Sequence, residues 1–259
     1  GFSRLGLTAG LGDDHAIRIV RQAMDLGVNL LDTAAVYGTE EVVGKAIAGV
    51  DRDSVVVCTK ASKPAADPTF TVKQIVGSLE DSLRRLNLDY VDVFQLHAVH
   101  PDAYPFVRDE IAPALLKERE KGKFRFLGVT ETSPNDNEQK MLQAALPDDF
   151  WDTAMFAFSL MSQNARSKVF PLTLKHRVGT LMMFVVRNIF SRPGLLAETM
   201  RQLAAEGKVP ADLAAKDNPL DFLVHPGGAT SLLDAAYRFA RHEPGADVVL
   251  FGTSDIAHM

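Results

Sequence analysis

Four residues that can act together on a carbonyl group lie at the ends of three successive predicted strands. Asp32 ends one strand and is followed five residues later by Tyr37, Lys60 ends the next strand, and His97 ends the one after that. In barrels of parallel strands, the strands' carboxyl ends meet at one face, where active sites are built. We therefore expect the four side chains to share one partly desolvated mouth, where neighbouring charges shift their pKa values.

The expected chemistry is proton transfer to a carbonyl oxygen. A lysine ammonium beside a phenol lowers the phenol pKa from about 10, so Lys60 would let Tyr37 donate a proton near neutral pH. Asp32 would pair with Lys60 and keep it charged, while a neutral His97 can hydrogen-bond the substrate oxygen or relay the proton. Each residue alone has an ordinary structural explanation, but their coincidence at three strand ends favours reversible reduction of an aldehyde or ketone.

Strand and helix patterns alternate along the whole chain. Strands are predicted over 4–8, 28–32, 54–60, 90–97, 124–130, 153–158, 180–184 and 246–251. Helices are predicted near 13–27 and over 71–87, 107–121, 134–145, 167–176 and 231–242. Eight strands alternating with helices indicate one (β/α)8 TIM-barrel domain over residues 1–259.

Local signals mark the ends of two helices. Asp13 or Asp14 can cap the first helix, and Gly27 can end it. Thr71 and Gln74 form a capping box for the helix over 71–87, which Asn87 can terminate.

The C-terminal third departs from the regular alternation. The stretch 192–228 is longer and more irregular than the other connections, and only residues 252–259 follow the last strand, too few for a closing helix. We expect the natural chain to extend before Gly1 and past Met259, or a second chain to cover apolar residues such as Val248, Val249 and Leu250.

Composition excludes several classes of protein. The 28 Lys and Arg against 33 Asp and Glu give a net charge of −5, with no basic run for nucleic acid. Cys58 is the single cysteine, which excludes an internal disulfide and is typical of a reducing compartment, so we expect a cytoplasmic protein. The longest apolar run is far shorter than the ~20 residues of a membrane helix.

Several segments resemble the signature segments of the aldo-keto reductases: 27–38, 58–60 and 89–97, supported by 40–46, 82–86, 122–123 and 128–129. The resemblance implies a (β/α)8 barrel that reduces a small-molecule carbonyl substrate with NADPH, or with NADH as the alternative. It also matches Asp32, Tyr37, Lys60 and His97 to the family's catalytic tetrad, with Tyr37 as the general acid. From the charge, the short apolar runs and the lack of an adequate ligand set, we expect no nucleic-acid, membrane or metal partner.

The resemblance also implies cofactor contacts, some of them altered. Thr130-Glu131 stands where the family commonly has Ser-Asn, and Met155 stands where it has Gln, so recognition of the nicotinamide carboxamide differs. The implied contacts with the cofactor come from Thr130, Met183 with Phe184 beside it, Arg187 with Arg192, and the turn Gly252, Thr253 and Ser254.

Three other functions remain open. Gly6, Gly10 and Gly12 followed by Asp32 resemble a Rossmann dinucleotide site, although the Tyr-x-x-x-Lys pair of a short-chain dehydrogenase is missing. A metal-dependent hydrolase would use His97 and His100, which fall short of the three ligands that zinc requires. A cofactor-binding protein of the same barrel family without catalysis is the third alternative.

Overall fold

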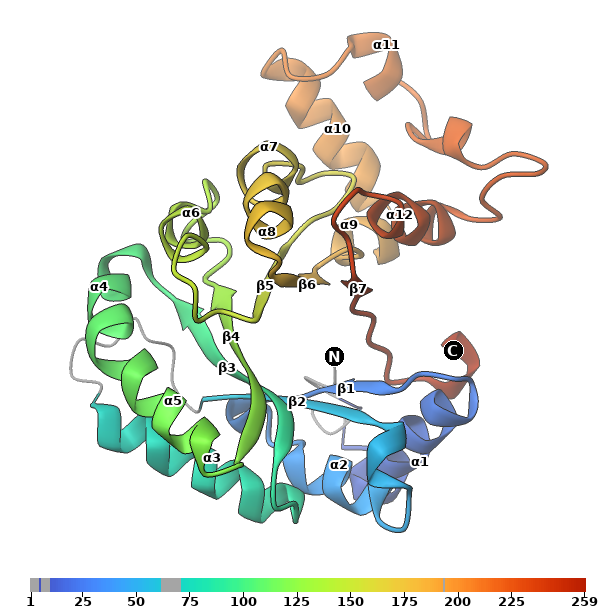
Figure 1. The fold of residues 1–259 in the computed structure, drawn as a ribbon. Helices are drawn as coiled ribbons and strands as arrows, with labels where there is room; N and C mark the ends of the chain where they lie inside the picture. The colour runs from blue at the N-terminus through green and yellow to red at the C-terminus, as the bar shows by residue number, and fades with distance from the viewer. Residues whose placement is uncertain (1–4, 6–9, 62–70, 193) are drawn as a thin grey trace.

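Within the described residues, seven parallel strands form the sheet around which the protein is built. The structure, a computed structural model, describes residues 5, 10–61, 71–192 and 194–259. Each strand pairs in parallel with the next along the chain, and the sheet curls into a half-barrel (Figure 1). The strands are β1 (Leu30–Asp32), β2 (Val56–Lys60), β3 (Val91–Val99), β4 (Phe124–Glu131), β5 (Thr153–Ala157), β6 (Gly179–Met183) and β7 (Val248–Val249).

Helices follow most strands and cover the convex face of the sheet (Figure 1). They are α1 (Gly12–Asp25), α2 (Glu40–Ile47), α3 (Val72–Leu86), α4 (Tyr104–Phe106), α5 (Ala112–Glu120), α6 (Lys140–Ala145), α7 (Ala165–Lys168), α8 (Phe170–His176), α9 (Asn188–Ser191), α10 (Leu195–Ala205), α11 (Ala211–Ala214) and α12 (Leu232–Arg241). A π-helical turn, η5 (Val107–Ile111), joins α4 to α5, and short 3-10 turns include η2 (Ala35–Tyr37), η3 (Arg52–Ser54), η4 (Pro101–Ala103), η6 (Asp221–Leu223) and η7 (Ile256–His258). None of the helices in the described ranges is long and apolar enough to cross a membrane.

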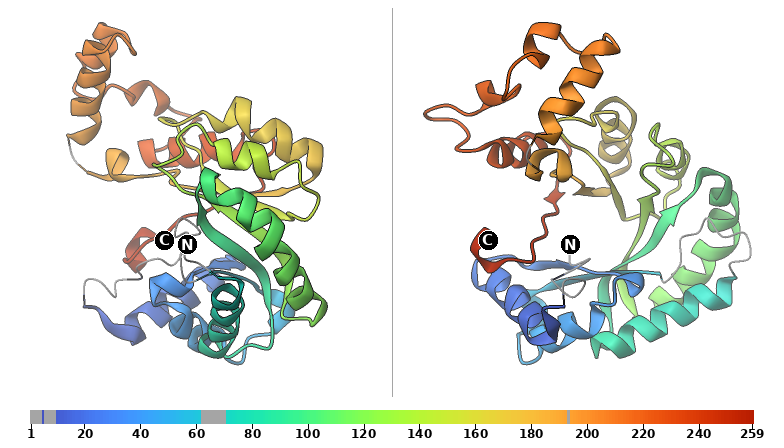
Figure 2. Two further views of the ribbon diagram at one scale, coloured as in Figure 1. Left: turned by 90° about the vertical axis from the view of Figure 1, so that its left-hand side faces the viewer. Right: turned by 180° about the vertical axis from the view of Figure 1, so that it is seen from behind.

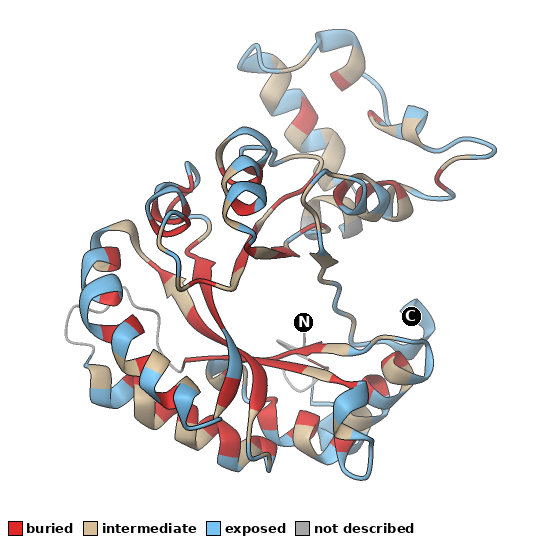
Figure 3. Cartoon of the chain, in the orientation of Figure 1, coloured by how far each residue is buried: buried red, intermediate tan, exposed pale blue. Residues whose placement is uncertain are grey.

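Most strand residues are buried, as Figure 3 shows by the red colour along the strands. An outer cluster between sheet and helices includes Leu31, Val57, Leu96 and Val129. An inner cluster on the concave face consists of Cys58, Val93, Met155 and Leu181. Because side chains alternate along a strand, this division shows that Lys60, two residues after Cys58, also faces inward.

The predicted order of elements agrees with this sheet. The strictly sequential strand order is that of a barrel and differs from the reversed order of a Rossmann sheet, so the Rossmann interpretation is wrong. The predicted first strand, 4–8, lies outside the described residues apart from Leu5, which is buried.

Helix ends are confirmed in one case and corrected in another. Thr71 and Gln74 form the predicted capping box of α3, and Asn87 ends it in the left-handed conformation. Asp13 and Asp14 lie inside the first turn of α1 without a side-chain capping bond. There they favour the helix through its dipole instead.

The helix predicted over 134–145 is shorter than expected. Its helical part, α6, begins at Lys140, because the Asp136 carboxylate accepts hydrogen bonds from the amides of Lys140 and Met141 at 3.0 and 2.9 Å. Gln139, with φ of 54°, cannot continue a helix backwards from that point.

The stretch 192–228 is less irregular than predicted. It contains α10 and α11, which stand away from the rest of the chain (Figures 1 and 2). Only Met200 of α10 and Ala214 of α11 are buried. The sequence analysis missed α10 although Leu196, Met200 and Leu203 recur at helical spacing.

The edge strands β1 and β7 border an open apolar pocket, lined among others by Val28, Leu30, Val248, Leu250 and Met259. The side chains of residues 248–250 are half-buried there.

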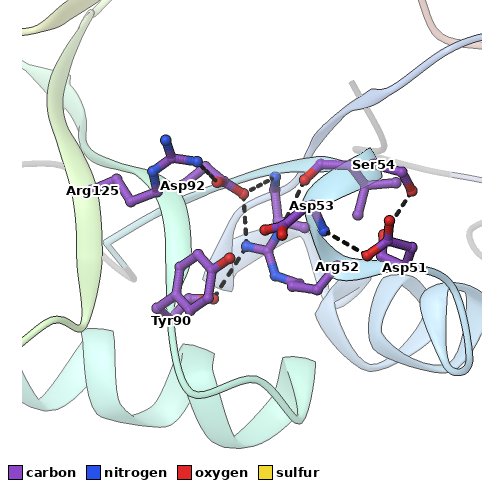
Figure 4. A network of polar contacts seen from close by, with 9 residues as sticks. Asp51, Arg52, Asp53, Ser54, Tyr90, Asp92 and Arg125 are labelled. Atoms are coloured by element: carbon purple, nitrogen blue, oxygen red, sulfur yellow. Dashed lines mark hydrogen bonds and ion pairs between the residues drawn. The ribbon is translucent and has the colours of Figure 1, made fainter.

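A network of ions joins strands β2 to β4 near their N-terminal ends (Figure 4). The buried Asp92 carboxylate accepts hydrogen bonds from Arg52 Nη2 at 2.6 Å, the Val57 amide at 2.8 Å and Arg125 Nη1 at 3.1 Å. The Arg52 guanidinium lies 4.3 Å from the centre of the Tyr90 ring. Both carboxylate oxygens are satisfied, and this end of a barrel lies opposite the face where active sites are built, so the network serves stability.

Candidate active site

The C-terminal ends of β1, β2 and β3 bring the predicted residues together. Asp32 is the last residue of β1, Lys60 the last of β2, and His97 lies near the end of β3. Tyr37 lies in η2, directly after β1. The parallel register pairs Asp32 with Cys58 and Lys60 with Gln95, so these strand ends share one edge.

Lys60 and Asp32 form a fully buried ion pair. Lys60 Nζ donates to Asp32 Oδ1 at 2.5 Å and to the Thr33 carbonyl at 2.7 Å. Lys60 has 0% and Asp32 3% of its surface exposed. Burial acts to lower the pKa of Lys60, but the Asp32 carboxylate and Tyr37 outweigh it and raise the pKa above its ordinary value. Lys60 is therefore a cation at neutral pH, and its two hydrogen bonds orient it.

Tyr37 lies against both Lys60 and His97. The Lys60 ammonium nitrogen is 5.0 Å from the centre of the Tyr37 ring, and the Tyr37 and His97 rings meet edge to face with centres 5.6 Å apart. Burial raises the pKa of Tyr37, and the Lys60 charge lowers it only in part. The predicted net lowering is therefore wrong, because desolvation of the phenolate exceeds its attraction to Lys60. Tyr37 carries its proton throughout the neutral range.

His97 is neutral, as predicted. Burial and the Lys60 charge lower its pKa to about 4, against a smaller opposing effect of Asp32. Its buried Nδ1 has no hydrogen-bond partner among the described residues. A neutral imidazole with one free polar atom is able to bind a substrate oxygen.

Hydroxyl and carboxylate groups that the sequence analysis did not assign hold the Tyr37 turn. The Thr33 and Thr39 hydroxyls lie 2.7 Å apart and bridge the turn. The buried Glu40 carboxylate accepts from Thr59 Oγ1 at 2.5 Å and from Arg85 Nε at 2.6 Å. These contacts tie the turn to β2 and α3. No local sequence signal reveals them, because the partners lie up to 45 residues apart.

The predicted carboxamide position, Thr130-Glu131, is buried at the end of β4. Thr130 Oγ1 accepts a hydrogen bond from the Ala98 amide at 2.7 Å. Glu131 Oε1 accepts from the Ala157 amide at 2.7 Å, whereas Glu131 Oε2 is buried without a partner in the described parts of the chain. Burial raises the pKa of Glu131 to about 7, although the Ala157 amide opposes this.

The other predicted cofactor residues lie beyond β5, β6 and β7. Met155 is buried in the inner cluster, and the half-buried Met183 packs against it. Phe184, with φ of 60°, is partly exposed and carries the Arg187 guanidinium 3.9 Å from its ring centre.

The turn after β7 contains the predicted Gly252, Thr253 and Ser254. Gly252 and Ser254 are exposed, while the Thr253 hydroxyl bonds to the backbone of Asp255. The Thr253 hydroxyl donates a hydrogen bond to the Asp255 carbonyl and accepts one from the Asp255 amide, and these two bonds stabilise the turn.

Nothing in the described ranges groups three or more His, Cys, Asp or Glu side chains as a metal site. His100 Nδ1 accepts from the Asp102 amide at 3.3 Å and caps η4. This contact gives His100 a structural role.

Comparisons with known proteins identify the family. The sequence model of the Aldo/keto reductase family matches residues 1–259. The chain is 29% identical over 267 aligned positions to aldo-keto reductase YhdN of Bacillus subtilis, covering 94% of this chain and 76% of that protein. It is 35% identical over 136 residues to L-galactose dehydrogenase of Arabidopsis thaliana, covering 50% of this chain and 43% of that enzyme.

Solved structures show the same fold. The holo form of aldo-keto reductase AKR11C1 from Bacillus halodurans superimposes with a TM-score of 0.69 at 27% identity, covering 95% of this chain and 79% of that one. An aldo-keto reductase from Klebsiella pneumoniae in complex with NADPH gives a TM-score of 0.62 at 22% identity, covering 95% and 77%. The predicted (β/α)8 fold class is confirmed. The chain belongs to the Aldo/keto reductase family and is an oxidoreductase.

Proposed function

We propose that this protein reduces an aldehyde or ketone to an alcohol, reversibly, with Tyr37 as the general acid. The observation that carries the proposal is the fully buried Lys60–Asp32 pair whose ammonium nitrogen lies 5.0 Å from the Tyr37 ring centre. A charged lysine without solvent stabilises the phenolate that Tyr37 becomes as its proton leaves.

Each side chain has one task in this mechanism. Tyr37 holds the proton that passes to the carbonyl oxygen, and Lys60 stabilises the negative charge left on the phenol oxygen. Asp32 keeps Lys60 charged and oriented. The neutral His97 binds the substrate oxygen beside Tyr37. The hydride for the carbonyl carbon is supplied by the reduced nicotinamide of NADPH when it is bound.

The residues at the mouth fit such a cofactor. The buried Glu131 Oε2 without a partner in the described chain is an acceptor suited to a carboxamide N–H, and the partly exposed Phe184 ring suits a flat heterocycle. We assign Thr130 and Met183 to the nicotinamide end. Arg187 and the turn Gly252, Thr253 and Ser254 are assigned to the phosphates. NADPH is proposed over NADH on family membership, and the NADPH complex of the Klebsiella relative supports it.

The remaining expectations are kept as proposals. The substrate is a small carbonyl compound, residues 1–259 form one domain, and the enzyme acts in the cytoplasm, where its free, buried Cys58 stays reduced.

A cofactor titration tests the function. Adding NADPH, and separately NADH, to the protein should change the fluorescence of the cofactor saturably, with NADPH binding more tightly. A panel of aldehydes should then be reduced, with NADPH oxidation unaffected by exhaustive chelation. If both nucleotides fail to bind, or if a chelator abolishes turnover and zinc restores it, carbonyl reduction by this site is contradicted. Saturable binding without turnover on any carbonyl would favour a non-catalytic cofactor-binding protein.

A further inference from the structure

Strand β3 contains one extra residue beside His97. Leu96 pairs with Val129 and Val99 pairs with Glu131, so the register between β3 and β4 shifts at this point. Two residues of β3, His97 and Ala98, thus lie opposite Thr130 alone. Leu96 and Val99 both belong to the outer cluster, although uninterrupted alternation would place residues three apart on opposite faces. The irregularity is a β-bulge, a device that re-aims side chains next to active sites.

Ala98 is the strained residue of this bulge. Its φ of 54° lies in the left-handed region, which is unfavourable for a residue with a Cβ atom. A side chain of β4 compensates: Thr130 Oγ1 accepts the Ala98 amide at 2.7 Å. Thr130 is only 1% exposed, so the acceptor of this bond is buried, while Ala98 is half-buried.

We propose that Thr130 is a positioning residue for His97: its hydroxyl holds the Ala98 amide, stabilises the bulge and thereby turns the imidazole towards Tyr37. The step from Thr130 to His97 passes through one peptide unit, since Ala98 follows His97 directly. The inference rests on the proposed function only for its effect on turnover. The geometry it describes belongs to the cofactor-free protein.

The role is distinct from a contact with the nicotinamide. A hydroxyl that accepts one hydrogen bond still has its own proton to donate, so Thr130 can serve a cofactor as well. Positioning of His97, however, is present before any cofactor binds, and this separates the two roles experimentally.

The test compares Thr130→Val, which keeps the shape and removes the hydroxyl, with Thr130→Ser, which keeps the hydroxyl. The first readout is an NMR pH titration of the His97 imidazole in cofactor-free protein. The wild type and Thr130→Ser should keep the low pKa of about 4 that comes from burial beside Lys60. Thr130→Val should move it upward by at least half a unit, because a freed bulge lets the imidazole reach water.

The second readout is turnover on a carbonyl substrate. We expect kcat to fall roughly tenfold in Thr130→Val, the size expected for one lost hydrogen bond, and to be restored in Thr130→Ser. If the cofactor Kd rises while the His97 titration stays unchanged, Thr130 is a cofactor contact only and the proposal is overturned. If neither the wild type nor any variant reduces a carbonyl compound, the proposed function is contradicted. The His97 titration in cofactor-free protein still tests the positioning role in that case.

Ala98→Gly provides an independent check, because glycine adopts positive φ without strain. The His97 pKa change caused by Thr130→Val should be smaller in the Ala98→Gly background than in the wild type, and the double-mutant cycle measures this coupling. Equal changes in both backgrounds would show that strain at Ala98 is not what the Thr130 hydroxyl opposes.

Discussion

Buried carboxylates at the two ends of the sheet differ in how far their cationic partners are exposed to solvent. Near the N-terminal ends, Asp92 has both oxygens bonded, to the Val57 amide and to two arginines whose side chains are 22% and 59% exposed. At the C-terminal ends, Asp32 faces a lysine with no exposed side-chain surface. The ion pair at the mouth is therefore excluded from solvent, whereas the two arginines at the opposite end are partly exposed to it.

Several buried polar atoms at the mouth have no hydrogen-bond partner in the described chain. In the described residues, His97 Nδ1, Glu131 Oε2 and Gln139 Oε1 are buried and unpaired there. Unpaired buried polar atoms cost stability, so they are expected where a ligand completes them. The comparison shows two uses of a buried carboxylate in one barrel: both oxygens of Asp92 are bonded at one end, whereas one oxygen of Glu131 is left unpaired in the described chain at the other.

The largest effect is expected for Lys60→Met. Lys60 lowers the pKa of Tyr37 against burial, so its loss raises that pKa further and makes the phenol a weaker acid. Reduction should slow by about 10²–10⁴-fold in kcat, the usual range for general acid catalysis. In a pH profile, the fall in rate that accompanies deprotonation of Tyr37 should move to higher pH.

Lys60→Met also leaves Asp32 buried without its partner. The double variant Lys60→Met/Asp32→Asn removes that unpaired charge and serves as the matched control for folding. A folded double variant with wild-type kcat would show that Lys60 does not contribute to catalysis.

The second effect concerns Glu131→Gln and should be a gain in stability. The pKa of Glu131 is raised from 4.5 to about 7 by burial, so the folded state holds its proton more tightly than the unfolded state. The wild type therefore loses stability as pH rises from about 4.5 to about 7, by on the order of 3 kcal/mol in total. Glutamine stays neutral and avoids this loss.

Urea unfolding measures the difference at two pH values. Glu131→Gln should have the larger free energy of unfolding at pH 8 and should match the wild type at pH 4.5. Glu41→Gln, on the exposed start of α2, is the surface control and should change little at either pH. A glutamine variant that is less stable at pH 8 would show that the charged carboxylate is well accommodated at the mouth.

The smallest effect is expected at the opposite end of the strands. Asp92→Asn keeps an oxygen for the Val57 amide but loses the charge that binds Arg52 and Arg125. Bonds to charged groups contribute about 1.5–3 kcal/mol when shielded, so we expect about 2 kcal/mol of lost stability because the arginines are partly solvated. The kcat should stay at the wild-type value. A loss of turnover without a loss of stability would break the division between the two ends.

Features that depend on local residue patterns and on the order of the strands could be predicted from the sequence. The capping box at Thr71 and Gln74 depends on residues three apart, and the proximity of Asp32, Lys60 and His97 follows from their places at or near the ends of consecutive strands. Both are therefore visible in a single sequence.

The remainder depends on contacts between distant residues or on a balance of energies. The bulge at Ala98 is held by Thr130, 32 residues away, and no spacing rule reveals it. The direction of the Tyr37 pKa shift was missed because it depends on how deeply the ring is buried, which only the folded chain determines.

The most direct test of the mechanism is the kcat of Tyr37→Phe on a carbonyl substrate that the wild type reduces. The substitution removes the proton donor and keeps the ring that packs on His97. We expect kcat to fall by about 10²–10⁴-fold with the NADPH Kd nearly unchanged, while His100→Ala, which alters only the cap of η4, stays close to the wild type. Wild-type kcat in Tyr37→Phe would contradict the assignment of Tyr37 as the general acid.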